Sequence, residues 1–261
     1  MAPSHRKVVY ICFMKLSVLL PFLLCFFAIA SCKKEVDETP AETITSTINI
    51  EFKNEVDGAP ISSSGLIYTN PSQEAYSIDL LKYYISHISL TNDQGLSVEV
   101  YDHKLIDALS TANNSISVKD IPDGNYTNIV FHLGVDHHHN HTGDQAGDLD
   151  PIYGMLWTWN TGYIFFKHEG LYTKADGTNE ALLYHLGTDP TYTQVSLPLN
   201  FSLNKETKTI ELLFNLNDLY RSPVGIDFEG NNIHQSTAAG DADWIMAITS
   251  NIPNSFSATI Q

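Results

Sequence analysis

The chain has 261 residues, with 14 Lys and Arg against 30 Asp and Glu, and a formal net charge of −16 at pH 7. This length suits one large all-β domain or two small ones. A surface this acidic repels nucleic acid and attracts cations, so nucleic-acid binding is excluded as a function.

The first predicted element is an export signal over residues 1–31. An apolar run follows Met14 and Lys15 and closes on the sequence IASC at residues 29–32. A small residue before a cysteine is typical of a lipoprotein signal, and the run is too short for a membrane span. We therefore expect Cys32 to be lipid-modified and to anchor the protein in the cell envelope, at the outer membrane or the periplasmic face. A non-cleaved anchor is the alternative.

A short tether is predicted between the lipid and the folded domain. Residues 32–42 are acidic and contain Pro40 but no aromatic residue, which is typical of a disordered linker. All three cysteines, Cys12, Cys25 and Cys32, lie within or at the end of the signal. The domain predicted over residues 43–261 therefore has neither a disulfide nor a thiolate ligand.

Strand signals recur throughout that domain. Apolar residues alternate with polar ones, or cluster with aromatic residues, over residues 43–53, 78–90, 96–106, 126–135, 194–203 and 207–216. A turn at 92–95 separates two of these segments, and the turn at 204–206 predicts a hairpin of residues 194–203 with 207–216. Residues 241–252 instead space Trp244, Ile248 and Ile252 four apart, which predicts a helix. The expected fold is all-β, an antiparallel β-sandwich of immunoglobulin or jelly-roll type with a short C-terminal helix.

Histidines are the most conspicuous candidate ligands. Four of them, His137, His138, His139 and His141, crowd into one loop that continues into several aspartates. Imidazole suits copper, zinc and nickel, but a flexible loop loses much entropy when it arranges consecutive histidines around one ion. Weak metal capture and a plain polar loop remain open, with a dedicated site as a third possibility.

The isolated histidines are weaker indications of a metal site. We interpret four of them as structural groups within strands, namely His87, His103, His132 and His168. His185 ends a strand before a glycine turn, where a side chain can face a cleft, and His234 lies in a polar loop before the predicted helix. The sequence contains no H-E-x-x-H, G-x-S-x-G or P-loop motif.

Two tryptophans stand two residues apart. Alternate residues of a strand share one face, so Trp157 and Trp159 are expected side by side, with Met155 on the same row. Such a row can be ordinary core, or an oxidisable wall beside a metal.

The order of several motifs resembles that found in the MbnP-like copper-binding proteins. The landmarks are YYIS at 83–86, IPDGNY at 121–126, FHLGVD at 131–136, GDLDP at 147–151, GMLWTWNTGY at 154–163, EG at 169–170, HLG at 185–187 and His234. The GMLWTWNTGY element is the most specific of them. The likeness extends from about Ile48 to Phe256.

The resemblance implies a β-sandwich that binds copper for acquisition, storage or delivery, and no enzymatic activity. It further implies His185 and His234 as imidazole ligands, and oxidation of Trp157 or Trp159 to kynurenine by a MauG-type di-haem partner, with Trp159 narrowly favoured. The loop histidines, His137, His138, His139 and His141, match no family motif and are secondary metal candidates. Many relatives carry four cysteines, which this domain lacks.

Two other function classes stay open at this point. Exposed tryptophans and tyrosines could stack on a glycan or bind a protein partner. A metal-dependent enzyme would need an open coordination position beside a general base.

Overall fold

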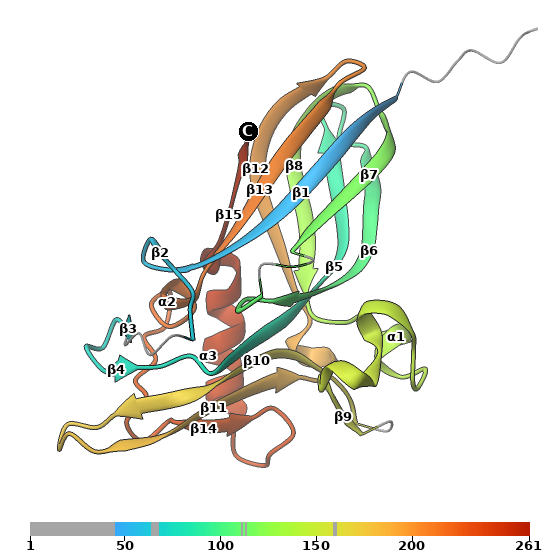
Figure 1. The fold of residues 1–261 in the computed structure, drawn as a ribbon. Coiled ribbons are helices and arrows are strands. Elements are labelled where there is room, and N and C mark those ends of the chain that lie inside the picture. Colours follow the sequence, from blue (N-terminus) through green and yellow to red (C-terminus); the bar gives the residue numbers. More distant parts are fainter. Residues whose placement is uncertain (1–44, 64–67, 111, 113, 159–160) are drawn as a thin grey trace, which may run out of the picture. The chain divides into compact units, whose positions relative to one another are not determined.

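The computed structural model describes residues 45–63, 68–110, 112, 114–158 and 161–261. Two sheets make up most of this part of the chain (Figure 1). Residues 42–261 form one compact unit. The predicted signal, the Cys32 anchor and the tether lie outside the described residues.

The smaller sheet has the strand order β15-β13-β1-β2, with β7 paired to β1. Its strands are β1 (Thr45–Val56), β2 (Ala59–Pro60), β7 (Ser115–Pro122), β13 (Thr207–Asn215) and β15 (Phe256–Ile260). The β1–β13 pair is parallel and the other pairs are antiparallel.

The larger sheet has the order β12-β8-β5-β10-β11-β14. The strand β5 pairs with β6, β8 and β10, so it is the central strand. The strands are β3 (Tyr68–Thr69), β4 (Ala75–Tyr76), β5 (Leu80–Asn92), β6 (Ser97–Asp107), β8 (Gly124–Leu133), β9 (Leu156–Thr158), β10 (Gly162–Thr173), β11 (Asn179–Gly187), β12 (Thr193–Leu203) and β14 (Ile233–Gln235). Only β11–β14 is parallel among its described pairs.

The helices are short. They are α1 (His137–Asn140), α2 (Leu216–Leu219), α3 (Ala242–Asn251) and the 3-10 turns η1 (Gly147–Leu149), η2 (Pro151–Tyr153), η3 (Asp189–Thr191) and η4 (Ile252–Ser255). The predicted C-terminal helix is confirmed as α3, which buries Trp244 and Ile248. Among the described helices, none has the length and apolar character needed to cross a membrane.

The core lies between the two sheets. Strand β1 buries Ile48, Ile50 and Phe52 in alternation, as a strand with one covered face does. Phe256 of the smaller sheet packs against Phe131 of the larger one, with ring centroids 5.1 Å apart. The all-β antiparallel sandwich is therefore confirmed, with two parallel pairs added to it.

The turn at 92–95 is confirmed, whereas the hairpin predicted over residues 194–216 is wrong. Strands β5 and β6 pair around the 92–95 turn. Strands β12 and β13, in contrast, belong to different sheets, since β12 pairs with β8 whereas β13 pairs with β1 and β15. Alternation shows which residues face the core but does not identify the partner strand, so the turn at 204–206 crosses between sheets instead of closing a hairpin.

Candidate metal centre

The carboxylate of Asp136 organises the His-rich segment. It follows β8 and caps α1, where its Oδ1 accepts hydrogen bonds from the backbone amides of His138 (2.9 Å) and His139 (3.3 Å). Asp is a preferred residue at this position, because its oxygen satisfies amides that lack a partner within the helix. The consecutive histidines therefore form a fixed turn, and Oδ2 of Asp136 is free for other groups.

Three imidazoles meet at this second oxygen. The Oδ2 atom of Asp136 lies 2.6 Å from Nδ1 of His139, 3.0 Å from Nε2 of His103 and 3.3 Å from Nε2 of His87. The rings come from α1, β6 and β5, and those of His103 and His139 have centroids 4.3 Å apart. Residues from three separate elements thus place their nitrogens around one point.

An irregularity of β5 brings His87 to that point. The register between β5 and β8 shifts between Ser86 and Ser89, and His87 has a φ of 49°. A bulge of this kind redirects one side chain, and a positive φ on a residue other than glycine is uncommon. Such local strain is typical of functional positions.

Two further carboxylates orient these rings. Glu99 Oε1 lies 2.7 Å from Nδ1 of His87, and Asp102 Oδ1 lies 2.8 Å from Nδ1 of His103. An imidazole that binds a metal through one nitrogen usually donates the other N–H to a carboxylate, which fixes its tautomer and orientation. We call the set His87, Glu99, Asp102, His103, Asp136 and His139 the inner centre.

Burial and hydrogen bonds shift the pKa values of three groups in the inner centre, two in favour of cation binding and one, that of His87, against it. Burial opposes ionisation of Asp136, but hydrogen bonds from His139 and His87 outweigh it and hold the pKa of this carboxyl well below its usual range. Burial lowers the pKa of His103, although Asp102 acts in the opposite direction. Burial also disfavours the charged form of His87, yet its hydrogen bonds to Glu99 and Asp136 raise its pKa. A charged carboxylate and a neutral His103 are both competent metal ligands.

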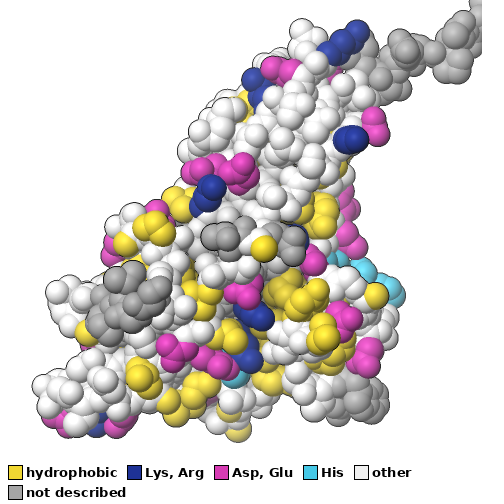
Figure 2. All heavy atoms as spheres, viewed as in Figure 1, with side chains coloured by type: hydrophobic (Ala, Val, Ile, Leu, Met, Phe, Trp, Pro, Cys, Tyr) yellow, Lys and Arg dark blue, Asp and Glu magenta, His cyan; other side chains and the backbone are white. Residues whose placement is uncertain are grey.

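The inner centre is reachable from solvent. A cavity of about 320 Å³ is lined by Asp102, His103 and His139, together with Tyr101 and Gln145. In Figure 2, His side chains are exposed at the edge of the molecule where Figure 1 places α1. An ion can therefore enter without separation of the two sheets.

The donors favour a transition metal ion. Three imidazoles and one carboxylate suit copper(II), zinc or nickel, whereas magnesium and calcium prefer oxygen ligands throughout. The residues present thus fit the copper that the sequence resemblance implies.

A family model matches residues 45–240 of the chain and bears the name MbnP. The chain belongs to the MbnP family. The solved structure "MbnP from Methylosinus trichosporium" is 16% identical to it, with a TM-score of 0.49, over 83% of this chain and 99% of that one. No curated protein matches the chain. The inner centre of this MbnP-family chain lies wholly inside the matched segment.

The structure does not bring His185 and His234 together. On the parallel pair β11–β14, His234 is in register with Tyr184, so His185 points to the opposite face. His185 Nε2 lies 2.8 Å from Glu169 Oε1, whereas the His234 ring stacks on Trp244 with a centroid distance of 4.8 Å. The expectation that these two imidazoles converge in a single pocket is therefore wrong.

Trp157 does share a face with His185. Its ring covers Gly187, where a Cβ atom would lie only 2.6 Å from ring atom Cζ3, and Gly187 stands two residues after His185. Its indole N–H is buried and has no hydrogen-bond partner among the described residues. Trp159, the other candidate for oxidation, lies outside the described residues.

The loop histidines separate into two groups around α1. His139 joins the inner centre, whereas His137 and His141 both contact Asp189. His138 is exposed, and its ring lies 5.2 Å from that of His139.

Sequence reasoning alone misses His87 and His103 as candidate ligands. It assigns both to structural positions in strands, yet they supply two of the three imidazoles at Asp136. The turn at 92–95 carries the necessary signal, because pairing of the strands on either side of it places His103 opposite Ser86, next to His87. The neighbouring His132 stacks on Tyr192 at 4.4 Å, and its Nδ1 is buried without a partner in the described part of the chain.

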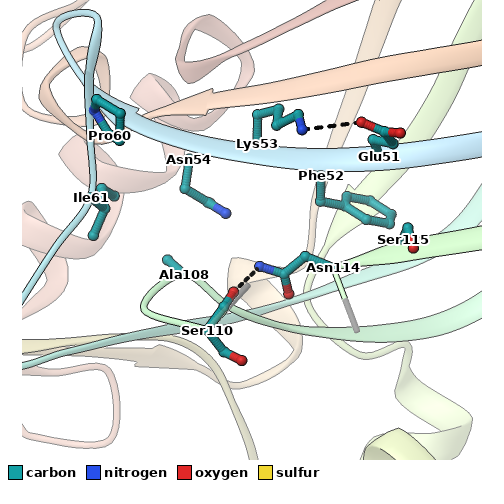
Figure 3. Close-up of a pocket in the computed structure, with 10 residues that line it drawn as sticks. All are labelled: Glu51, Phe52, Lys53, Asn54, Pro60, Ile61, Ala108, Ser110, Asn114 and Ser115. Atoms are coloured by element: carbon teal, nitrogen blue, oxygen red, sulfur yellow. Dashed lines mark hydrogen bonds and ion pairs between the residues drawn. The ribbon is translucent and has the colours of Figure 1, made fainter. Parts of the chain in front are cut away.

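A second cavity offers no comparable chemistry. It measures about 330 Å³ and lies beside β1, where Lys53 pairs with Glu51 at 3.1 Å and Asn114 donates to the carbonyl of Ser110 (Figure 3). Its described lining contains no histidine. Its lining therefore lacks the imidazole donors that the inner centre provides.

Proposed function

We propose that this MbnP-family chain is a lipid-anchored envelope protein that binds copper(II) at the inner centre. The observation that carries the proposal is the convergence of three imidazole nitrogens within 3.3 Å of one carboxylate oxygen, Asp136 Oδ2. Affinity for such nitrogen and oxygen donors rises to a maximum at copper(II) along the divalent series. Membership of the MbnP family supports copper over zinc.

In this proposal each residue of the inner centre has a separate role. His87 and His103 bind through Nε2 and Asp136 contributes Oδ2, because ligand atoms of these three residues lie within 4.8 Å of one another, while His139 holds the Asp136 carboxylate through Nδ1. Glu99 and Asp102 hold the His87 and His103 rings in the required tautomer, because each contacts the Nδ1 atom of its imidazole. Three protein donors leave one position of a four-coordinate site for a further ligand. On the ground of family membership, we propose a binder for acquisition, storage or delivery, not an enzyme.

We also propose that one tryptophan of this chain is oxidised. Conversion of Trp157 or Trp159 to kynurenine by a MauG-type di-haem partner would give that residue an aniline nitrogen and a carbonyl oxygen, and the copper(II) site proposed at the inner centre does not depend on these donors. For Trp157 these donors would lie on the face of the sheet that carries His185. The half-buried position of Trp157 against Gly187 gives less support to a glycan-stacking role.

Substitution of single imidazoles tests the assignment. We expect His103→Gln and His87→Gln to weaken copper(II) binding more than about 100-fold, because loss of a ligand exceeds the 10–100-fold effect of an outer partner. The measurement is a competition titration of the full mature protein, with electron paramagnetic resonance to count the bound nitrogens. Thermal unfolding of each metal-free variant reports whether it is folded.

His185→Gln is the matched control. It removes a buried imidazole paired with a carboxylate, as His103→Gln does, but from outside the inner centre. We expect nearly unchanged copper affinity for this variant. Affinity that depends on His185 and not on His87 or His103 would move the site to the Trp157 face of the sheet.

A further inference from the structure

The side of α1 that faces away from the inner centre carries another group of metal-binding side chains. His137 Nδ1 lies 2.5 Å from Asp189 Oδ2, and His141 Nε2 lies 3.1 Å from each oxygen of Asp189. The two imidazole rings have centroids 4.6 Å apart. We call His137, His141 and Asp189 the outer group.

We infer that the outer group is a second transition-metal site, weaker and more readily exchanged than the inner centre. The inference rests on the proposed function for the choice of copper, although the outer group can bind metal even if the inner centre does not. Two histidines four apart are neighbours on a turn of helix, so they can bind one ion together. Asp189 supplies an oxygen donor from a distant part of the chain.

Asp189 is held in place by buried structure. The side-chain amide of Asn140 donates to Asp189 Oδ1 at 2.8 Å, and Asn140 itself is only 2% exposed. The Oδ1 atom of Asn140 accepts the backbone N–H of Tyr163 at 2.7 Å. A buried side chain anchored on β10 thus fixes the carboxylate of the outer group. An accidental contact between surface side chains would lack such support.

The backbone before Asp189 has an unusual conformation. Thr188 has φ 76° and ψ 148°, a region that is almost restricted to glycine and is unfavourable for a β-branched residue. Its carbonyl accepts hydrogen bonds from the backbone N–H and the hydroxyl of Thr191, which hold the conformation. Asp189 directly follows this strained residue and contacts His137 and Asn140 of α1.

The two sites differ in exposure and donor number. The side chain of His103 in the inner centre is 5% exposed, whereas those of His137 and His141 are 79% and 44% exposed. The outer group offers two imidazoles and one carboxylate, so solvent or another ligand must complete the coordination of its ion. Fewer donors and greater exposure make its ion more weakly bound and easier to remove.

The capped turn α1 belongs to both sites. Asp136 caps it and His139 faces the inner centre, while His137 and His141 extend to Asp189. An ion in the inner centre would fix the turn and with it the spacing of the outer imidazoles. The outer group is therefore positioned to load the inner centre or to release copper to a recipient, by ligand exchange alone.

Metal stoichiometry tests the inference. The full mature protein is dialysed against copper(II) at graded concentrations and the bound metal is counted by elemental analysis. We expect two ions per chain, with one lost first to a weak chelator. In His141→Gln and in Asp189→Asn the weakly held ion is absent and the tightly held ion remains. His138→Gln, an exposed histidine on the same turn, is the control and retains both ions.

The outcomes separate this inference from the proposed function. One ion per chain in the unaltered protein, or a weak ion that persists in both His141→Gln and Asp189→Asn, would overturn the outer site. Loss of the tight ion in His103→Gln with the weak ion retained supports both assignments. An unchanged tight ion in His103→Gln would reject the inner centre and leave the outer site standing. The Asp189→Asn variant keeps an oxygen for Asn140 Nδ2, so it preserves the local fold if His141→Gln does not.

Discussion

Asp136 shows how one side chain can combine a structural and a chemical role. Its Oδ1 caps the first turn of α1 and its Oδ2 faces three imidazoles. A capping interaction contributes about 1 kcal/mol to stability, so Asp136→Ala would disturb both the fold and the inner centre. Substitutions of His87 and His103 are more informative, because these residues are placed by strand pairing and not by a cap.

His168 provides a pH test that is separate from the metal ligands. It is fully buried with its Nδ1 2.6 Å from the Tyr220 hydroxyl, and burial lowers its pKa from 6.5 to about 4. The unfolded chain then binds a proton more readily than the folded one. This contribution to stability is complete above pH 6.5 and is lost as the pH falls toward about 4.

Comparison with His168→Gln isolates this effect. As the pH decreases, we expect the free energy of unfolding of the metal-free protein to fall more steeply than that of the variant. The difference between the two slopes should reach up to about 1.4 kcal/mol per pH unit. Chemical denaturation at a series of pH values between about 4 and 7 measures both slopes. Equal slopes would show that His168 is not buried as a neutral group.

At the level of elements, α1 depends on its contact with the start of β10. Gly162 has a φ of 90°, and a Cβ atom there would lie 2.2 Å from Asn140 Oδ1. We expect Gly162→Ala to destabilise the protein by about 3 kcal/mol, through backbone strain combined with overpacking, and to weaken metal binding by displacing Asn140. Urea denaturation and copper titration measure the two effects.

Gly177→Ala is the matched control for this substitution. Gly177 also has a positive φ, of 82°, but a Cβ atom added there would meet no other atom within 4 Å. Its replacement should cost only about 1 kcal/mol, which is the strain of the backbone alone. Similar losses for the two variants would mean that the contact between Gly162 and Asn140 does not support α1.

The elements also show what the sequence could predict. Periodicity correctly predicted the strands on either side of the 92–95 turn and α3, because alternation and four-residue spacing depend on nearby residues. It failed for the 194–216 region, where the choice of partner strand depends on the whole sandwich. The prediction that His185 and His234 lie in one pocket was wrong for a related reason. These residues lie on adjacent strands, but their register places them on opposite faces.

The inner centre was partly within reach of sequence reasoning. His139 was among the predicted loop ligands, and the turn at 92–95 implied that His87 and His103 are neighbours. The bulge at His87 and the capping of α1 by Asp136 could not be predicted, since both depend on tertiary contacts. These two features convert scattered histidines into one group of donors.

At the scale of the whole molecule, the net charge and the fold both favour the binding of cations. A net charge of −16 raises the local concentration of cations around the protein. Within that field, the inner centre places three carboxylates beside three imidazoles on one side of the larger sheet. A lipid on Cys32, as proposed, would keep this binding surface at a membrane.

Anomalous X-ray scattering at the copper edge, from crystals of the copper-loaded protein, is the most direct test of copper binding at the inner centre. We predict a strong peak bounded by His87, His103, His139 and Asp136. A strong peak beside His185 and Trp157, with none near Asp136, would contradict this assignment.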